Sequence, residues 1–354
     1  MMACAQKDLD LKYLRRCFTL ARKAGVKTYP NPLVGAVVVK NGRVIGEGYH
    51  HACGEDHAEV DALKNCIEDP SEATIYVNLE PCNHHGRTPP CTHAILESKI
   101  RRVVYATQDD NPVASGGGKF LYEHGVEVQS GLMDLEAREF NHVFFTYILK
   151  GRPHVTLKVA QTINSKVARK DLSSRWITCS DARKNVHRER SLNQAILVGK
   201  GTLLTDDPLL NVRHVKGISP IPIIIDSIGN LPANLNVFQN PKTLVFSSSQ
   251  MPQLTTEVIN WEGDLSRVDQ WEFMFNKLKE RGIISLYVEG GSTINSFLLS
   301  NNLVDCLHVY IGPKFFANDG IDSFNLSREL PFKLKSSKSI GESVKLVYMR
   351  TQGE

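Results

Sequence analysis

Hydrophobic and polar residues follow a helical and then a strand-like period near the start of the chain. Apolar side chains recur every three or four positions over 11–25, which predicts an amphipathic helix that ends at Gly25. Residues 34–40 and 43–48 instead have the pattern of two strands. Asn41-Gly42 joins them, and this pair is a strong signal for a tight hairpin.

Helical and strand-like segments keep alternating up to residue 150. Helical periodicity covers 58–68, and a helix is again expected at 134–150. Such alternation predicts a three-layer α/β domain with helices on both faces of one sheet. The strands expected between these helices are 73–79, 102–106 and 126–129.

A second α/β series begins after Gly151-Arg152-Pro153. This short segment is expected to separate two domains, 1–150 and 151–354. Several of the later strands are continuously apolar, which is typical of buried parallel strands. The strands expected here are 155–160, 194–198, 221–226, 243–246, 285–289, 306–311 and 344–349.

Composition narrows the class of protein. The chain has 354 residues, of which 42% are hydrophobic and 23% charged, as in globular domains, and its net charge is +4 without a basic cluster. A mild positive excess suits small phosphorylated molecules and does not indicate a nucleic-acid partner. No apolar run approaches the ~18 residues of a membrane span, and the start lacks a signal-peptide core. Because the eight cysteines are scattered, we expect a reducing, cytoplasmic location without a disulfide framework.

The residues that carry chemistry are His57, Glu59, Cys82 and Cys91. One imidazole and two thiolates can bind zinc and leave a fourth position for water. Glu59 lies two residues after the His and can move protons between that water and a substrate. This H-x-E … P-C order is that of zinc nucleobase deaminases. The alternative is a capping His with two buried free cysteines.

Local structure favours a shared site for these ligands. His57 precedes a predicted helix, and Cys82 follows the strand 73–79 directly after Pro81. Cys91 follows two prolines and is expected to open another helix, whose positive end favours a thiolate.

The eleven-residue segment from Pro81 to Cys91 resembles that of bifunctional riboflavin-biosynthesis deaminase/reductases. Segments 30–35, 46–50 and 54–59 share this resemblance, and it extends over essentially the whole chain. It implies a cytidine-deaminase-like three-layer α/β domain followed by a dihydrofolate-reductase-like α/β domain. The activity implied is zinc-dependent hydrolytic deamination of 2,5-diamino-6-ribosylamino-4(3H)-pyrimidinone 5′-phosphate, and then NADPH reduction of the ribosyl side chain to ribityl. The oligomeric state is left open, with a homo-oligomer as one alternative.

Substrate residues are expected in both halves. In the first, Asn31 lies between two prolines and can present its amide to a heterocycle, while His50, His84 and Arg87 can hold ring and phosphate groups. In the second, the resemblance implies that the substrate is held by Ser174, Arg190, Leu210, Arg213 and Glu289.

Two glycine-rich turns in the second half suggest a cofactor site. Gly199–Thr202 and Gly290–Thr293 each follow a predicted strand, and free amide groups at a helix start bind phosphate. Taken alone, each is equally consistent with a plain strand-to-helix turn. Lys158, inside an apolar strand, could lie beside the nicotinamide and the sugar. The resemblance implies NADPH contacts by Ala160, Trp176, Thr202, Asp206, Gly290, Gly291, Ser292, Thr293, Ile294 and Asn295.

Each of these residues also has an ordinary structural interpretation. Arg190 and Arg213 could be solvated surface side chains, and Lys158 could face solvent at a sheet edge. Trp176 could pack in the core, and Asp206 could cap a helix.

The second half also departs from the family pattern. Asn164-Ser165 stands where the family usually has Asp-Gly, Gln194 where it often has Asp, and Asn230 where it has Arg. In the family's late Pro-Lys-x-x-Gly segment, Ala317 takes the place of the final Gly. The departures motivate one alternative, a monofunctional deaminase with a silent reductase-like domain. A nucleic-acid base deaminase would need a basic groove with stacking aromatics. A zinc-stabilised scaffold would give Glu59 no role.

Overall fold

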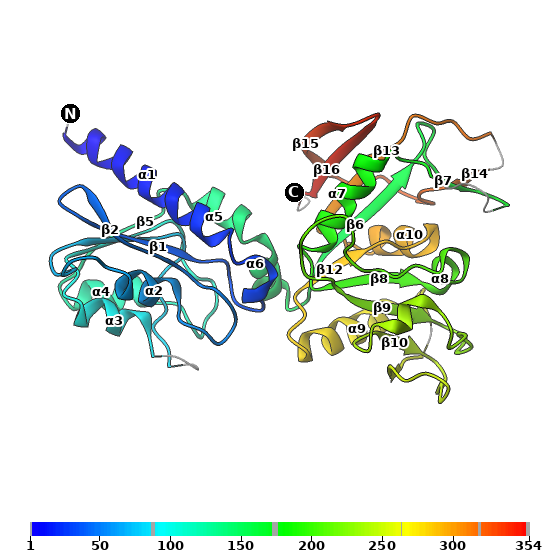
Figure 1. Cartoon of the computed structure of the whole chain (residues 1–354), viewed down its shortest axis with the longest axis horizontal. Coiled ribbons are helices and arrows are strands. Elements are labelled where there is room, and N and C mark those ends of the chain that lie inside the picture. Colours follow the sequence, from blue (N-terminus) through cyan, green and yellow to red (C-terminus); the bar gives the residue numbers. More distant parts are fainter. Residues whose placement is uncertain (1, 86–88, 172–175, 263, 318–319, 352–354) are drawn as a thin grey trace. The chain divides into compact units, whose positions relative to one another are not determined.

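The computed structural model describes the chain except for residues 1, 86–88, 172–175, 263, 318–319 and 352–354. Its internal contacts divide the chain into two compact units, Met1–Gly151 and Arg152–Glu354 (Figure 1). Each unit contains its own sheet and its own hydrophobic cores, so the two are described separately.

The first unit is built on a five-stranded sheet in the order β2-β1-β3-β4-β5. β1 is antiparallel to both of its neighbours, whereas β3, β4 and β5 are parallel. The predicted hairpin between β1 and β2 is confirmed, with positive φ angles of 48° at Asn41 and 74° at Gly42. The strands are β1 (Gly35–Lys40), β2 (Arg43–Tyr49), β3 (Thr74–Val77), β4 (Arg102–Tyr105) and β5 (Glu127–Ser130).

Helices cover both faces of this sheet, which confirms the predicted three layers (Figure 1). Alternate residues of β1 face opposite sides, because successive strand side chains point to opposite faces. Val37 and Val39 pack in the core with α1 and α5, and Ala36 and Val38 pack with the other three helices. The bounds are α1 (Met2–Ala21) and α5 (Asp134–Phe140) on one face, and α2 (Ala58–Lys64), α3 (Cys91–Glu97) and α4 (Gly117–Glu123) on the other.

Four predicted helix boundaries in the first unit are wrong. The first helix, predicted to end at Gly25, ends at Ala21, because residues 22–24 form a turn before the 3-10 helix Gly25–Thr28. α1 begins at Met2, well before residue 11. The prediction missed these turns because residues 5–9 are exposed and carry no apolar stripe. α2 ends at Lys64, since Ile67 donates its amide to the Ile45 carbonyl and leaves the helix axis. The helix predicted over 134–150 is interrupted, and α6 (His142–Lys150) starts after Asn141.

The second unit has a nine-stranded sheet in the order β11-β10-β9-β8-β12-β6-β13-β16-β15. The strands are parallel from β11 to β13 and antiparallel from β13 to β15, so the predicted buried parallel strands are confirmed. The bounds are β6 (His154–Gln161), β8 (Ala195–Gly199), β9 (Ile221–Asp226), β10 (Leu244–Ser247), β11 (Glu257–Asn260), β12 (Ser285–Val288), β13 (Cys306–Ile311), β15 (Phe332–Ile340) and β16 (Ser343–Arg350); β7 (Lys166–Arg169) and β14 (Gly320–Asp322) form a separate pair.

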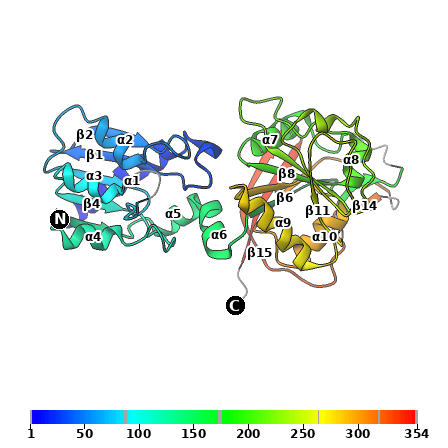
Figure 2. The ribbon, with the colours of Figure 1, turned by 90° about the horizontal axis from the view of Figure 1, so that it is seen from below.

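This sheet is also sandwiched between helices, with α7 and α8 on one face and α9 and α10 on the other (Figure 2). Trp271 and Phe275 are the largest fully buried side chains of α9. Tyr287 and Tyr310 fill the opposite face beneath α7. The helices are α7 (Ser180–Arg190), α8 (Lys200–Asp206), α9 (Val268–Glu280) and α10 (Ser292–Ser300).

The hydrophobic pattern gave no indication of β15 at the edge of this sheet. Its central residues are exposed and mostly polar, so no apolar alternation marks it. Lys333, Lys335 and Lys338 lie along it, and lysines are one way in which proteins protect an edge strand from pairing with another chain.

Among the described residues, no helix combines the length and the apolar character required to cross a bilayer.

Candidate active sites

Three elements of the first unit bring the predicted metal ligands to one point. His57 is the N-cap of α2, and Cys91 is the first residue of α3, directly after Pro90. Cys82 lies in the segment that follows β3 and accepts a hydrogen bond from the Cys91 amide, at 3.4 Å between N and Sγ. The two helix starts and the strand end therefore converge, as the sequence predicts.

The geometry suits a tetrahedral metal ion. His57 Nδ1 lies 3.2 Å from Cys91 Sγ and 3.4 Å from Cys82 Sγ. All three ligand atoms lie within 4.8 Å of one another. One imidazole and two thiols form a donor set that favours zinc and leaves one coordination position for a non-protein ligand.

Glu59 is fully buried beside this cluster. It lies in the first turn of α2, only 3% exposed, and its carboxyl group contacts the Cys91 thiol. Burial raises the pKa of Glu59 to about 7, and the negative charge on Cys82 acts in the same direction. A hydrogen bond from Cys91 and a contact with His57 lower the pKa of the Cys82 thiol. A buried carboxyl group that is not one of the three candidate ligands thus lies next to them.

Asn31 and His50 form a second pair next to the metal ligands. His50 is buried and its Nδ1 donates to the Asp56 carbonyl at 2.9 Å. Nε2 therefore carries a lone pair and accepts a hydrogen bond from the Asn31 amide at 3.1 Å. The His50 ring lies edge-on to the ring of His57, with 5.4 Å between centroids. The structure thus brings Asn31 and His50 to the metal cluster.

The remaining candidates of the first unit lie in the loop between Cys82 and Cys91. His84 is half-buried, and its Nδ1 is a buried nitrogen without a hydrogen-bond partner in the described part of the chain. A substrate group could satisfy it. His85 is exposed and its ring lies edge-on to that of His93. Arg87 falls outside the described residues.

Sequence reasoning missed two asparagines that fix the Asn31 turn. The backbone amide of Leu33 donates to Asn141 Oδ1 at 2.9 Å, and the Leu33 carbonyl accepts from both Asn78 and Asn141. Asn78 also accepts a hydrogen bond from the Gly35 amide. These bonds explain why α5 and α6 are separated at Asn141.

Glu80 and Gly117 were also missed, and they hold the Cys82 segment. Glu80 is buried and accepts hydrogen bonds from the amides of Asp109 and Gly118. A Cβ atom at Gly117 would lie 1.8 Å from the Pro81 carbonyl oxygen, so only glycine fits there. The run Gly116-Gly117-Gly118 was the signal in the sequence that could have identified this close approach.

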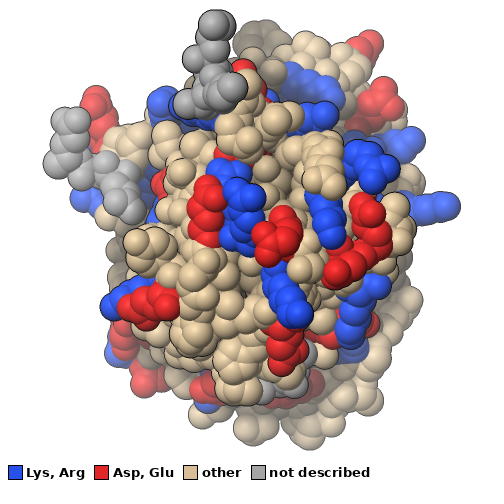
Figure 3. Space-filling view, turned by 90° about the vertical axis from the view of Figure 1, so that its left-hand side faces the viewer, with Lys and Arg blue, Asp and Glu red and all other residues tan. Residues whose placement is uncertain are grey.

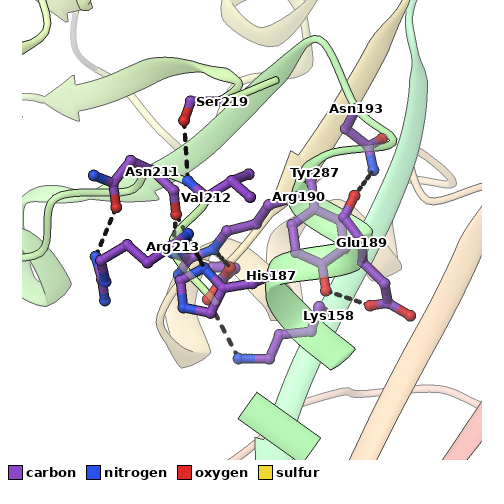
Figure 4. Close-up of polar contacts among 11 residues, drawn as sticks. Lys158, His187, Glu189, Arg190, Asn193, Asn211, Val212, Arg213, Ser219 and Tyr287 are labelled. Carbon is purple, nitrogen blue, oxygen red and sulfur yellow. Dashed lines mark hydrogen bonds and ion pairs between the residues drawn. The ribbon is translucent and has the colours of Figure 1, made fainter. Parts of the chain in front are cut away.

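In the second unit, a buried ion-pair cluster forms on the face of the sheet beneath α7 (Figure 4). Glu289 follows β12 and accepts from Lys158 Nζ at 3.3 Å and from Arg190 Nε at 2.7 Å. Arg190 also donates through Nη1 to the Asn211 carbonyl at 3.1 Å. Burial alone would raise the pKa of Glu289, but the charges of Arg190 and Lys158 lower it to about 2. The carboxylate therefore remains charged inside the fold.

The structure decides between several interpretations of the reductase residues. The edge interpretation of Lys158 is wrong, because β6 lies in the interior of the sheet between β12 and β13. The core interpretation of Trp176 is also wrong, since its side chain is 57% exposed and stacks under the Arg183 guanidinium. Arg190 is buried, whereas Arg213 is exposed.

Two further candidates complete this side of the second unit. Asp206 is the last residue of α8, so it does not cap the start of that helix. Leu210 is buried with a positive φ of 50°. Ser174 falls outside the described residues.

The two glycine-rich turns lie side by side. β8 and β12 are neighbours in the sheet, so α8 and α10 start at the same edge. A Cβ at Gly199 would lie 2.7 Å from Ile294, and one at Gly291 would lie 3.6 Å from Thr202 Oγ1. Asn295 is buried, and its Oδ1 has no hydrogen-bond partner among the described residues. Adjacent helix starts with close backbone approach fit a pyrophosphate.

The turn that departs from the family's Asp-Gly pair is held by local hydrogen bonds. Ser165 adopts the positive φ of 60° that glycine would favour. The side-chain amide of Asn164 donates to the Phe316 carbonyl at 2.7 Å, and its oxygen accepts from the Phe316 amide. Ala160 lies on β6 beside this turn and packs against the core under α7.

Gln194 and Asn230 also have structural partners. Gln194 donates to the Gly282 carbonyl and accepts from the Ile284 amide, which fixes the turn before β12. Asn230 contacts the Lys200 ammonium group, which is also 3.1 Å from Asp226. These substitutions therefore preserve the fold of the second unit.

One face of the molecule can be inspected for a concentration of basic side chains (Figure 3). Positive and negative side chains are interspersed on the face shown in Figure 3, without a basic stripe. The first unit also contains exposed ion pairs, such as those of Arg16 with Glu47 and of Lys64 with Asp56. This face does not have the basic groove that a nucleic-acid deaminase would need.

Comparison with known proteins places both units. Residues 7–107 match the cytidine and deoxycytidylate deaminase zinc-binding region, and residues 153–346 match the RibD C-terminal domain. The riboflavin biosynthesis protein RibD of Actinobacillus pleuropneumoniae is 39% identical over 96% of this chain and 95% of its own length. That of Aquifex aeolicus is 39% identical over 97% of this chain and 99% of its own.

A solved structure is similar over the same extent. It is the diaminohydroxyphosphoribosylaminopyrimidine deaminase/5-amino-6-(5-phosphoribosylamino)uracil reductase of Thermotoga maritima, with 36% identity and a TM-score of 0.89. It covers 98% of this chain and 100% of its own. The zinc and NADPH predicted from the sequence agree with the two matched domains, and a silent second domain is not favoured. The chain belongs to the RibD family of bifunctional deaminase/reductases of riboflavin biosynthesis.

Proposed function

We propose that residues 1–150 deaminate a diaminopyrimidine that carries a 5-phosphoribosylamino group, and that residues 151–354 reduce the ribosyl part of the deaminated product. The name of the Thermotoga relative supports this substrate class. The observation that carries the deaminase half is the convergence of three metal-ligand atoms beside buried Glu59. The ion-pair cluster around Glu289 and the paired glycine turns support the reductase half.

In the deaminase, His57, Cys82 and Cys91 hold zinc, which activates water at neutral pH when it is bound. Glu59 would take one proton from the attacking water and deliver it to the ring nitrogen, and would then carry the second proton of that water to the amino group, which leaves as ammonia. Its burial beside the ligands positions the carboxyl group for both transfers. The reaction consumes one water molecule and releases one ammonia.

Asn31 and His50 recognise the pyrimidine ring in this proposal. Since His50 is held as the Nδ1–H tautomer, it fixes the Asn31 amide nitrogen as a donor to Nε2. The Asn31 side-chain oxygen is thereby oriented as an acceptor for an amino or ring N–H group of the substrate. His84 offers its buried Nδ1 to the same substrate, and Arg87 is assigned to its phosphate.

In the reductase, NADPH supplies the two electrons when it is bound. The turns at Gly199 and Gly290, with Ile294 and Asn295, bind its pyrophosphate, and Ala160, Trp176, Thr202 and Asp206 contact the rest. Lys158 is held by Glu289 and lies where it can contact the opened sugar. Two nitrogens of Arg190 are already engaged by Glu289 and Asn211. Exposed Arg213 is therefore the better phosphate ligand. Leu210 and Ser174, the latter outside the described residues, are assigned to the same substrate.

A cytoplasmic location is part of the proposal, because no disulfide bond joins the cysteines that the structure describes. No membrane or nucleic-acid partner is proposed. Homo-oligomer formation stays a prediction, and analytical ultracentrifugation of the full chain would test it.

A coupled assay with the diaminopyrimidine substrate tests both halves. Ammonia release followed by NADPH oxidation is expected from the full chain. Glu59→Gln should lower ammonia release about 100- to 10,000-fold, keep its zinc, and still oxidise NADPH when it is given 5-amino-6-(5-phosphoribosylamino)uracil. Ammonia release that survives in Glu59→Gln would contradict the role of Glu59. NADPH oxidation that fails in the wild-type chain would contradict the reductase half.

A further inference from the structure

Two residues of α7, one helical turn apart, hold the same backbone carbonyl. Arg190 Nη1 donates to the Asn211 oxygen at 3.1 Å, and His187 Nδ1 lies 3.1 Å from that same oxygen. The Arg213 amide lies 3.3 Å from His187 Nδ1 (Figure 4). His187 therefore contacts the backbone on both sides of Val212.

The segment that follows Leu210 needs such an anchor. Leu210 has a positive φ of 50° and a buried side chain, so the chain turns sharply there. The next residues form no regular helix or strand. Their contacts come from α7 and from Ser219, whose hydroxyl accepts a hydrogen bond from the Val212 amide at 3.0 Å. His187 is thus among the groups that hold this irregular backbone in place.

The side chain presented by this segment is cationic. The Arg213 guanidinium donates to Asn211 Oδ1 at 2.7 Å and lies near the guanidinium of Arg190. His187 is buried, and the ring of His214 lies edge-on to it at 4.7 Å. Burial lowers the pKa of His187 to about 4, and the charges of Arg190 and Arg213 act in the same direction. A neutral His187 can therefore hold the backbone without adding a third charge to the pair.

We propose that His187 is a positioning residue for the substrate's phosphate group: it holds the backbone of Asn211 and Arg213 against α7, so that the Arg213 guanidinium is presented to the phosphate. The proposal rests on the function proposed above, in which Arg213 binds that phosphate. It assigns specificity for the phosphorylated substrate to a residue that does not itself touch the substrate.

The chemistry of the imidazole fits this role. A protonated Nδ1 donates to the Asn211 carbonyl, and an unprotonated Nδ1 accepts from the Arg213 amide. The two tautomers are mutually exclusive, yet each of them ties the same segment to α7. Asparagine places an amide group close to the position of Nδ1, whereas glutamine extends to the position of Nε2. His187→Asn should therefore keep a hydrogen bond to the Asn211–Arg213 backbone, whereas His187→Gln fills similar space without that hydrogen bond.

The test uses the reductase half-reaction of the full, zinc-loaded chain. Steady-state kinetics are measured with 5-amino-6-(5-phosphoribosylamino)uracil and with the same compound without its phosphate. His187→Gln should raise KM for the phosphorylated substrate about five- to tenfold, as expected for one lost hydrogen bond, with kcat nearly unchanged. KM for the dephosphorylated compound should not change. His187→Asn should retain a KM close to that of the wild type.

Two further variants make the result decisive. Arg213→Ala should raise KM for the phosphorylated substrate at least as much as His187→Gln does. Arg188→Ala removes an exposed charge from the adjacent position of α7 and should leave both KM values unchanged. If Arg213→Ala has no effect, the phosphate assignment of the proposed function fails. If Arg213→Ala acts and His187→Gln does not, only the role of His187 fails.

A purely structural role would give a different pattern. In that case His187→Gln would raise both KM values equally or would lower kcat with both substrates. Equal KM values for His187→Asn and His187→Gln would also overturn the proposal. If His187→Gln does not fold, ¹⁵N-labelled histidine in the wild-type chain gives a second measurement. Inorganic phosphate should then raise the pKa of His187 in the wild type but not in Arg213→Ala, and an unchanged pKa would overturn the proposal.

Discussion

The two candidate sites differ in how far along the chain their residues come from. The zinc ligands and Glu59 lie between residues 57 and 91, on two short helices and a strand end. In the reductase cluster, Glu289 pairs directly with Lys158, 131 residues away, and also with Arg190 of α7. The first site is therefore defined by local sequence, and the second by the order of the strands in a nine-stranded sheet.

The sites also differ in what balances their buried charge. In the first, a thiolate and a buried carboxyl group face a position suited to a metal cation. In the second, the protein supplies its own counter-charges, because Glu289 is paired with two cations. A change at Glu289 should consequently affect the stability of its unit, whereas loss of Glu59 should mainly affect catalysis.

The largest expected effect on stability comes from Glu289→Gln. Buried Arg190 and partly buried Lys158 would lose their counter-charge, and breaking a buried pair typically costs about 3–5 kcal/mol. Denaturant unfolding of the second unit, followed by the fluorescence of its tryptophans, measures the loss. Glu280→Gln, which breaks an exposed pair with Lys277, is the control and should change little. Equal losses in both variants would contradict the difference between the sites.

The same residue predicts a dependence on pH. Because folding lowers the pKa of Glu289 from 4.5 to about 2, its contribution to stability is complete above pH 4.5 and is lost as the pH falls toward 2. Glu289→Gln should therefore show a shallower loss of stability between these pH values. Parallel pH profiles of the variant and the wild type would rule out this contribution.

A smaller effect is expected from Gly117→Ala in the first unit. The new Cβ would meet the Pro81 carbonyl oxygen at 1.8 Å and push the backbone that carries Cys82. Overpacking of this kind costs about 1–3 kcal/mol, and zinc should bind more weakly. At Gly118 the neighbour is the Tyr105 side chain, which can move, so Gly118→Ala should be milder. Thermal unfolding and zinc titration would distinguish the two variants. A smaller loss of stability and zinc affinity in Gly117→Ala than in Gly118→Ala would contradict the proposed contact with the Pro81 backbone.

The smallest effect is expected from Asn141→Ala. It deletes two hydrogen bonds to Leu33, while Asn78 still donates to the same carbonyl. The Asn31 turn should loosen at a cost of about 1 kcal/mol, and KM of deamination should rise a few-fold at constant kcat. Asn141→Asp keeps the acceptor for the Leu33 amide. Its KM of deamination should therefore lie between those of the wild type and Asn141→Ala. A lower kcat with an unchanged KM would exclude a role in substrate positioning.

Much of the fold could be predicted because its signals are local. The hairpin at Asn41-Gly42, most strands of both sheets and the zinc ligand set each depend on neighbouring residues. The polar edge strand β15 could not be predicted, since its exposed side chains follow no apolar alternation. The break at Asn141 could not be predicted either, because it depends on a bond to Leu33, 108 residues away.

The same distinction applies to the residues of the sites. The interpretation of Lys158 as an edge residue was wrong because strand order is not visible in a sequence, and β6 proved to be central. Asn78 and Glu80 lie within a stretch whose chemistry was recognised, yet their partners come from other segments. When a residue supports a site by hydrogen bonding to backbone groups far along the chain, no local sequence pattern identifies it.

The order of the two sites along the chain also has a consequence in time. During synthesis the ligands of the first site have all been made by residue 91. Glu289 follows about 200 residues later, which corresponds to ~10–40 s at about 5–20 residues per second. The metal site can therefore fold and fill while β12, which lies beside β6 in the finished sheet, does not yet exist. Until Glu289 is made, Lys158 is an ammonium group without its counter-charge. The second unit therefore depends for longer than the first on chaperones that bind incomplete chains.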